Sequence, residues 1–201
     1  MHKRNFLGAA MVAGLAGGVL AAPGRVGAQN AARSSAGPAL LTVTGLITAT
    51  NRGPFDPTFD QMMGKQKVNF DKARSFDFAA LTALPAVTIQ PTLEYDAKPH
   101  VLKGPLLTSV LKQCGVEPAA NLKLFLRAVD GYAAQVSLAE ATRFRFIVAT
   151  HLDGHPMALG GLGPLWAVCD VDRIPEKASV PLAERFGGCP WALYHIGISA
   201  A

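Results

Sequence analysis

The chain has 201 residues, of which half are hydrophobic and 16% are charged. This balance is typical of a globular domain with a substantial apolar core, and it excludes a disordered or fibrous chain. The net charge is +5, but lysine and arginine form no long run, so the sequence predicts no nucleic-acid-binding or anionic-membrane-binding surface.

The first 28 residues have the organisation of a cleavable signal peptide. A basic segment at residues 2–4 precedes a weakly apolar stretch at 8–22, and residues 26–28 supply the small side chains of a cleavage site. The apolar stretch is shorter than the roughly 20 residues that a membrane-spanning helix needs. We therefore expect an exported, soluble periplasmic protein that is not an integral membrane protein.

Residues 3–7, KRNFL, also resemble the twin-arginine export signal, with lysine where the first arginine is usual. That route carries folded proteins and is used by exported proteins that receive a cofactor in the cytoplasm. An ordinary secretion signal is the alternative. Removal of residues 1–28 takes away three basic residues and no acidic one, which leaves sixteen basic against fourteen acidic residues, a net charge of +2.

Residues 29–39 are small and polar, and they predict a flexible leader before a domain at 40–201. The segment LTVTGLIT from Leu41 alternates apolar residues with threonine, as a half-buried strand does. AVTIQPTL from Ala86 predicts a second strand that ends at Pro91. Between them, NRGPFDPTFDQ predicts a turn-rich excursion.

The clearest predicted helix covers residues 105–114. Pro105 suits the first helical position, and Gly115 follows as a stop. The apolar face of this helix consists of Leu106, Leu107, Val110, Leu111 and Cys114. We expect Cys114 to be a small core residue.

Five short segments rich in branched and aromatic residues follow and are predicted strands. They are LKLFLRAV from Leu122, AAQVSL from Ala133, RFIVATHL from Arg145, PLWAVCDV from Pro164 and WALYHIGI from Trp191. With no internal repeat, the sequence predicts an α+β fold, a β-rich single domain.

His151 and His155 have the spacing of a metal pair on a helix, but they flank Asp153-Gly154, a preferred two-residue hairpin turn. In such a hairpin His151 faces Pro156 and His155 faces Leu152, so the two imidazoles point to opposite sheet faces. We therefore predict no shared metal ion at these histidines.

Export makes disulfides possible, and three cysteines follow the predicted signal. Cys169 lies near the end of one predicted strand and Cys189 just before another, so they are the candidate disulfide pair. No cysteine spacing matches a zinc or redox motif, and we predict no metal site.

A ligand could lie against the loop at 154–168, GHPMALGGLGPLWAV, because glycines such as Gly161 and Gly163 let the backbone approach a flat molecule. Tyr132, in the turn Asp130-Gly131-Tyr132, could project its phenol into the same ligand pocket as this loop. A plain turn with a packed tyrosine is the alternative.

Several enzyme classes are excluded by missing motifs. The chain has no G-x-S-x-G, no H-E-x-x-H, no phosphate loop and no carboxylate pair at helical spacing. The glycines at 160–163 do not open a helix, so they do not form a dinucleotide-binding motif. The sequence therefore predicts neither a hydrolase nor a kinase.

Five segments occur in a recognisable order: LLTSVLKQCGV, LRAVDGYAAQVSLAEA, FIVATHLDGHPM, GLGPLWAVCDVD and WALYHIGI. This order resembles the molybdopterin-binding domain of the sulfite oxidase family, over roughly residues 42–198. The resemblance implies the fold of that family, and it places Tyr132, the glycine loop and Trp191 at the positions of the cofactor pocket.

The chain departs from the family at three positions that bind the molybdenum cofactor. The metal-ligand cysteine follows the strand that matches VTIQPTL, where this chain has residues 90–92, QPT. The family's phosphate-binding arginine corresponds to Trp166, and a lysine before the closing tryptophan corresponds to Pro190. These changes remove charge-assisted donors to a phosphate, so the resemblance implies that the cofactor is not bound in the usual way.

Some small exported members of the family are pterin-binding regulators that work with a membrane-bound signalling partner. A bare pterin has no phosphate and no metal, and it needs aromatic stacking, for which Tyr132, Trp166 and Trp191 are candidates. Core packing is the alternative for both tryptophans. The first hypothesis is therefore a pterin-binding sensor or carrier.

Two other hypotheses stay open. One is a molybdopterin-dependent oxidoreductase, with Cys169 or Cys189 at the metal and a membrane redox subunit as partner. The other is an interaction module without a ligand.

Overall fold

The computed structural model of the protein describes residues 37–117 and 121–201. The predicted signal peptide, residues 1–28, and residues 29–36 of the predicted leader lie outside the described residues. In the part of the chain that is described, no helix combines the length and the apolar character needed to cross a membrane.

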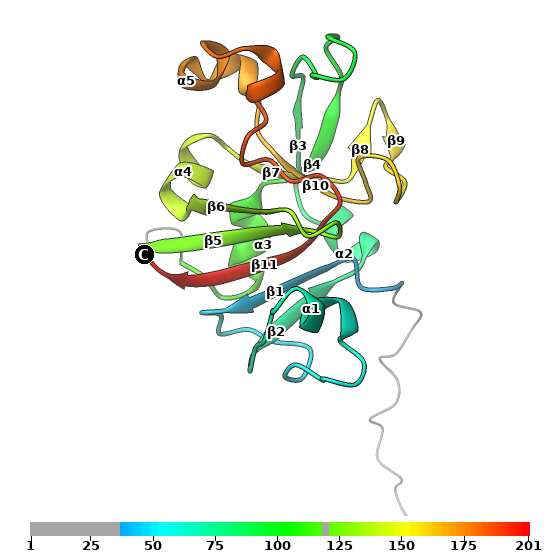
Figure 1. Cartoon of the computed structure of the whole chain (residues 1–201), viewed down its shortest axis with the longest axis vertical. Helices are drawn as coiled ribbons and strands as arrows, with labels where there is room; N and C mark the ends of the chain where they lie inside the picture. Colours follow the sequence, from blue (N-terminus) through cyan, green and yellow to red (C-terminus); the bar gives the residue numbers. More distant parts are fainter. Residues whose placement is uncertain (1–36, 118–120) are drawn as a thin grey trace, which may run out of the picture. The chain divides into compact units, whose positions relative to one another are not determined.

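A five-stranded mixed sheet forms the centre of the described domain (Figure 1). In spatial order its strands are β2 (Ala73–Phe76), β1 (Leu41–Gly45), β11 (Leu193–Ala200), β5 (Leu122–Ala128) and β6 (Ala133–Ser137). β1 and β11 run parallel, and every other neighbouring pair is antiparallel. The first and last strands of the described chain are therefore hydrogen-bonded neighbours.

One face of this sheet carries the main hydrophobic core. Val43 of β1, Leu126 of β5 and Ile196 of β11 are fully buried there with apolar side chains of α3 (Leu107–Gln113) and α4 (Leu138–Arg143). The alternation of side chains along a strand sends the residues between them to the opposite face. That face carries Thr44, among others.

The remaining strands form two further sheets. They are a four-stranded sheet in the order β3-β4-β8-β9 and a pair formed by β7 and β10. The bounds are β3 Ala86–Ile89, β4 Leu102–Pro105, β7 Ile147–Ala149, β8 His151–Leu152, β9 His155–Pro156 and β10 Trp166–Val168.

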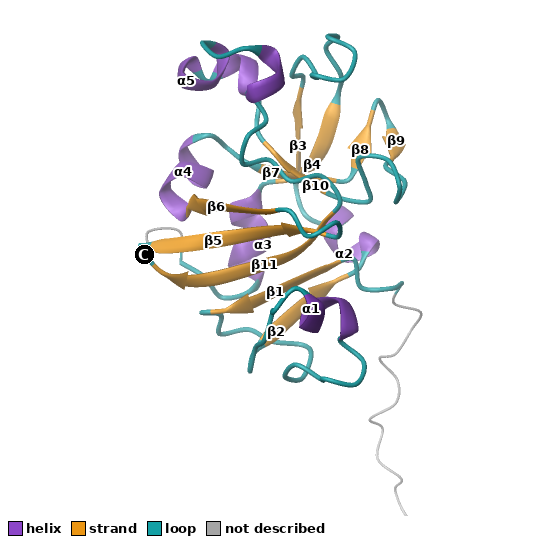
Figure 2. Ribbon diagram, in the orientation of Figure 1, coloured by secondary structure: helices purple, strands orange, loops and turns teal. Residues whose placement is uncertain are grey.

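The helices are short, as Figure 2 shows. Besides α3 and α4 they are α1 (Gln61–Lys65), α2 (Phe78–Thr82), α5 (Pro175–Ala178) and the 3₁₀ helices η1 (Val171–Arg173) and η2 (Leu182–Glu184). Side-chain caps fix two of the starts, because Asp77 accepts the N–H of Ala80 at 2.7 Å and Ser137 that of Glu140 at 3.0 Å. The prediction of a β-rich α+β domain is confirmed.

A strand occurs in each predicted segment, but RFIVATHL contains two, β7 and β8, which belong to different sheets. The predicted helix starts later than expected. Pro105 is the last residue of β4, paired with Ala86, and α3 begins at Leu107. The assignment of Pro105 to the first helical position is therefore wrong, because strand pairing carries the extended chain through the proline. Gly115 has φ +71° and ends the helical region as predicted.

The hairpin predicted at Asp153-Gly154 is confirmed. Both turn residues have positive φ, +48° and +83°, as a type I′ turn requires. His151 pairs with Pro156, and Leu152 pairs with His155. His151 packs on the ring of Phe78 at 5.5 Å between centroids.

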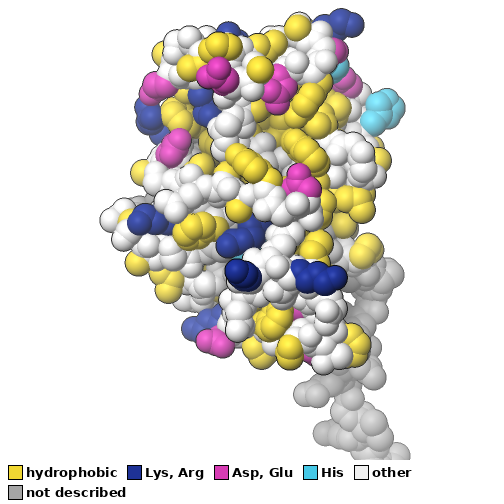
Figure 3. All heavy atoms as spheres, in the orientation of Figure 1, with side chains coloured by type: hydrophobic (Ala, Val, Ile, Leu, Met, Phe, Trp, Pro, Cys, Tyr) yellow, Lys and Arg dark blue, Asp and Glu magenta, His cyan; other side chains and the backbone are white. Residues whose placement is uncertain are grey.

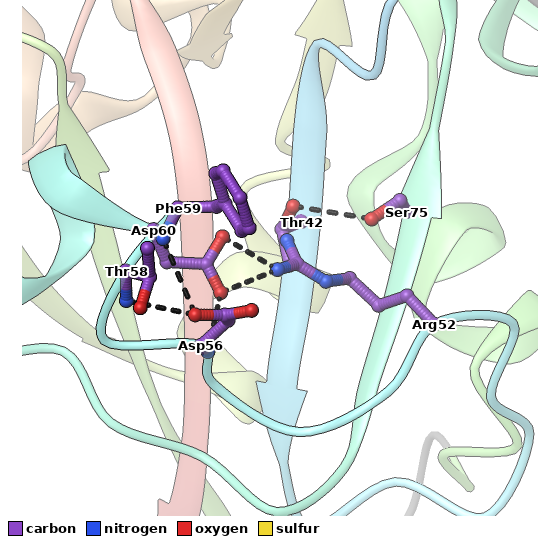
Figure 4. Close-up of polar contacts among 7 residues, drawn as sticks. All are labelled: Thr42, Arg52, Asp56, Thr58, Phe59, Asp60 and Ser75. Carbon is purple, nitrogen blue, oxygen red and sulfur yellow. Dashed lines mark hydrogen bonds and ion pairs between the residues drawn. The ribbon is translucent and has the colours of Figure 1, made fainter.

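The excursion between β1 and β2 is held by a compact set of polar contacts (Figure 4). Arg52 Nη2 donates to both carboxylate oxygens of Asp60 at 2.7 Å, and the Asp56 N–H donates to the same carboxylate at 2.9 Å. The Arg52 guanidinium also lies 5.0 Å from the ring centroid of Phe70. Burial acts to raise the pKa of Asp60, but the bonds from Asp56 and Arg52 outweigh it and hold that pKa below its ordinary value.

Candidate functional site

Two adjoining hollows share a wall made of Tyr95 and Trp191. The first has a cavity volume of about 240 Å³ and also includes Glu94, Asp130 and Tyr132 in its lining. The second has a volume of about 470 Å³, and its lining includes Leu159, Gly160, Gly161 and Leu162. We call the two hollows together the aromatic site.

Three separate segments bring the aromatic rings together. Tyr95 lies at the tip of the β3–β4 connection, in a turn closed by the Leu93 N–H bond to the Lys98 carbonyl at 2.9 Å. Tyr132 lies in the β5–β6 turn, where its N–H donates to Asp130 Oδ1 at 2.9 Å. Trp191 comes just before β11. The site is thus built from loops whose ends are fixed by strands.

The aromatic site exposes much of its apolar surface. Tyr95 is 55% exposed, Tyr132 is 49% exposed and Leu159 is 69% exposed, whereas Trp191 is half-buried. Large apolar side chains that gather in a concave region typically mark a place where a ligand or partner binds. Tyr132 lines the first hollow, Gly160 and Gly161 line the second, and Trp191 lines both. A shared ligand for Tyr132 and the glycine loop stays a prediction.

The polar lining of the first hollow is acidic. Glu94 and Asp130 contribute carboxylates, and no lysine, arginine or histidine among the described residues lines either hollow. Burial raises the pKa of Tyr95 to about 12, and the neighbouring Glu94 carboxylate acts in the same direction. The phenol of Tyr95 therefore stays neutral at physiological pH and can donate a hydrogen bond.

The glycines of the loop have different surroundings. Gly161 lines the second hollow, and a Cβ there would meet only the Ala158 carbonyl oxygen, at 3.7 Å. Gly163 is buried, and a Cβ there would collide with the side chain and backbone of Met157. Gly163, a predicted ligand-binding residue, therefore serves close packing of the loop instead.

Trp166, the other predicted ligand-binding tryptophan, is a core residue. It is fully buried on β10 and lies in neither hollow. Its indole N–H donates to the Cys189 carbonyl at 2.8 Å, and its ring centroid is 5.5 Å from that of Phe186. The pairing of β10 with β7 inside the core buries this side chain, so the alternative of core packing holds for Trp166.

The candidate disulfide cysteines are neighbours. Cys169 and Cys189 are both buried free thiols in the structure, and the Cys189 thiol acts on the pKa of Cys169. That interaction and burial raise the pKa of the Cys169 thiol. Burial also raises the pKa of Cys114, to about 12, in keeping with its expected place in the core. A Cys169–Cys189 disulfide stays a prediction.

Sequence reasoning missed Glu94 and Tyr95. They come after Leu93, which follows the QPT stretch at 90–92. The turn-forming letters LEYDAKP after a strand were the available signal, since loop residues at strand ends often line binding sites.

Within residues 37–117 and 121–201, no group of three or more His, Cys, Asp or Glu side chains could hold a metal ion. No model of a known protein family matches the chain, and no curated protein matches it.

Proposed function

We propose that the protein binds a flat, uncharged heterocycle of the pterin type in the aromatic site and acts as a sensor or carrier. The observation that carries the proposal is the convergence of Tyr95, Tyr132 and Trp191 beside an open glycine loop. Partly exposed rings of this kind offer stacking surfaces at low conformational cost.

The polar groups of the site suit the edge of a pterin. The aminopyrimidinone ring of a pterin presents neighbouring N–H donors, and a carboxylate such as that of Glu94 or Asp130 can accept them. The neutral Tyr95 phenol can donate to a ring nitrogen or carbonyl. Stacking on Trp191 with one carboxylate on the donor edge would both bind and orient the ring.

The same lining does not fit an intact molybdenum cofactor. The cofactor carries a phosphate, and the two carboxylates of the hollow would repel it where the family provides cationic donors. Cys189 lines the first hollow, but it is only 4% exposed. These residues favour binding of a pterin without phosphate over binding of the molybdenum cofactor that the oxidoreductase hypothesis requires.

The finer features of the proposal rest on the resemblance to the sulfite oxidase family. They are the fold of its molybdopterin-binding domain and a membrane-bound signalling partner. The order of predicted strands and the place of Tyr132, Gly161 and Trp191 around one site support the first of these. Export to the periplasm rests instead on the predicted signal peptide at residues 1–28.

The test has two parts. Native protein is analysed for molybdenum and for pterin fluorescence, and purified protein is titrated with pterin while the quenching of pterin fluorescence is followed. We expect Trp191→Ala to weaken binding about fivefold, since lost stacking is worth roughly 1 kcal/mol. Thermal unfolding should change little.

Phe59→Ala is the matched control, because Phe59 is 83% exposed on the β1–β2 excursion and lines neither hollow of the aromatic site. It should leave pterin binding unchanged. Stoichiometric molybdenum in the native protein would contradict the proposal and support the hypothesis of a molybdopterin-dependent oxidoreductase. Absence of any pterin binding would contradict the proposal and support the hypothesis of an interaction module without a ligand.

A further inference from the structure

A separate hollow lies on the face of the five-stranded sheet that is turned away from the main core. Its cavity volume is about 390 Å³, and it lies between β1, β5, β11 and residues 67–72 of the excursion. Its lining includes Thr44, Lys67, Lys72, Arg127, His195 and Gly197. We call it the basic hollow.

A buried imidazole in this hollow lacks a hydrogen-bond partner. His195 is 1% exposed, and its Nε2 is 2.9 Å from Thr44 Oγ1. Among the described residues its Nδ1 has no partner. Leaving a buried polar nitrogen unsatisfied destabilises a fold by roughly 1–3 kcal/mol, and His195 is one of the residues that line the hollow, so a molecule bound there could supply the partner.

The protonation of His195 fits a donor role. Burial, with the nearby Arg127 charge acting in the same direction, lowers the pKa of His195 to about 3, so the ring is neutral at physiological pH. A neutral ring carries one proton. If the Thr44 hydroxyl donates to Nε2, that proton is on Nδ1, the atom without a partner.

Cationic side chains surround this imidazole. Arg127, Lys67 and Lys72 line the hollow, and none of them takes part in an ion pair within the described residues. Asp71 is the one carboxylate among the lining residues. In Figure 3, Lys and Arg side chains gather on the part of the surface where α1 and β11 lie in Figure 1. The hollow therefore has an excess of positive charge.

A glycine keeps the space between the donors open. A Cβ at Gly197 would lie 3.3 Å from His195 Cε1 and 3.5 Å from Arg127 Nη1. A side chain there would occupy the position where a ligand can touch both groups. The Arg127 guanidinium is steadied by Phe125, whose ring centroid is 5.7 Å away.

We propose that the basic hollow binds a small dianionic oxyanion of the phosphate type, with the Arg127 guanidinium and the His195 Nδ1–H as its main donors. Lys67 and Lys72 supply further charge from the excursion, which the Arg52–Asp60 contact holds in place (Figure 4). The proposal is independent of the aromatic site, which shares no lining residue with this hollow.

The test is a titration of the ¹⁵N-labelled full chain with inorganic phosphate near neutral pH, at constant ionic strength set with chloride. We expect the His195 Nδ1 resonance to shift as phosphate is added and to reach a plateau when the site is saturated. A histidine with only a structural role would show no such shift. Arg127→Gln should weaken binding about tenfold or more, because a charge-assisted contact is lost. Gly197→Ala should weaken it as well.

Lys123→Gln is the matched control. Lys123 is on β5, on the same strand face as Arg127 by alternation, but it does not line the hollow. It should change phosphate affinity less than about twofold. Equal weakening by Lys123→Gln and Arg127→Gln would overturn the proposal, because it would mean general charge attraction.

Two further measurements complete the design. If Arg127→Gln lowers the thermal unfolding temperature, the double variant Lys67→Gln/Lys72→Gln, at two exposed positions, takes its place with the same expectation. Titration with glycerol phosphate separates two sources of the anion, since tighter binding than inorganic phosphate assigns the hollow to a phosphomonoester. An unmoved Nδ1 resonance with both anions would overturn the proposal.

Discussion

Trp166 donates its indole N–H to the carbonyl oxygen of Cys189 at 2.8 Å, from a fully buried position. Trp191, two residues beyond that cysteine, instead lines both hollows of the aromatic site. The two tryptophans therefore differ in burial, and substitutions should separate an effect on stability from the proposed effect on binding.

Replacing Trp166 with Phe should lower the free energy of unfolding by about 1–3 kcal/mol, because the Cys189 carbonyl loses its buried donor. Urea denaturation of the wild type and the variant measures this change. Pterin affinity should stay within about twofold. A loss of affinity without a loss of stability would mean that Trp166 contacts the ligand after all.

Two glycines of the same loop should respond differently to alanine. Gly163→Ala places a methyl group against Met157, so we expect a loss of about 1–3 kcal/mol in unfolding free energy. Gly161→Ala meets only the Ala158 carbonyl at 3.7 Å, and its effect should stay within about 0.5 kcal/mol. Thermal unfolding of both variants decides the point. Equal stability of the two would contradict the packing role of Gly163.

The stability of the protein should depend on pH through His100. Its Nδ1 is 2.6 Å from Asp153 Oδ2 and its Nε2 is 3.0 Å from Asp96 Oδ2, and the bonds to Asp153 and then Asp96 raise the pKa of His100. A raised pKa in the folded state stabilises the protein fully below the ordinary value of about 6.5. This contribution is lost as the pH rises through the folded pKa.

The hydrogen bonds to His100 lower the pKa values of Asp96 and Asp153, so the stabilising effect of these groups is lost only as the pH falls through their folded pKa values. His100→Asn should therefore flatten the fall of the melting temperature above about pH 6.5. Scans from about pH 5 to about pH 9 measure it. His155→Asn, at an exposed position of the β8–β9 hairpin, is the control and should keep the wild-type slope.

Local patterns predicted much of the fold. The Asp153-Gly154 turn specified its own hairpin, and alternating residues specified strands such as β5, because backbone preference and burial agree there. The place of Pro105 depended on the pairing of β4 with β3, which involves residues far apart in the sequence. Such long-range pairing leaves no local trace.

The candidate sites were predicted less completely, for the same reason. The sequence offers nothing to distinguish Trp166 from Trp191. Trp166 is buried because its strand, β10, pairs with β7 in the core, and that pairing cannot be read from the local sequence. His195 was missed because simple alternation from Leu193 would put it in the core. A β-bulge between the two residues shifts the register and turns His195 to the other face.

The parallel pairing of β1 with β11 has a consequence for how the protein folds. Thr42 lies opposite His195, so the middle of the sheet stays vacant until the residues of β11 have been synthesised. Contacts this distant in sequence close slowly, because a long loop must be ordered before they form. During that delay the edges of β1 and β5 are open to unintended partners, and a chaperone that shields them would be of direct benefit.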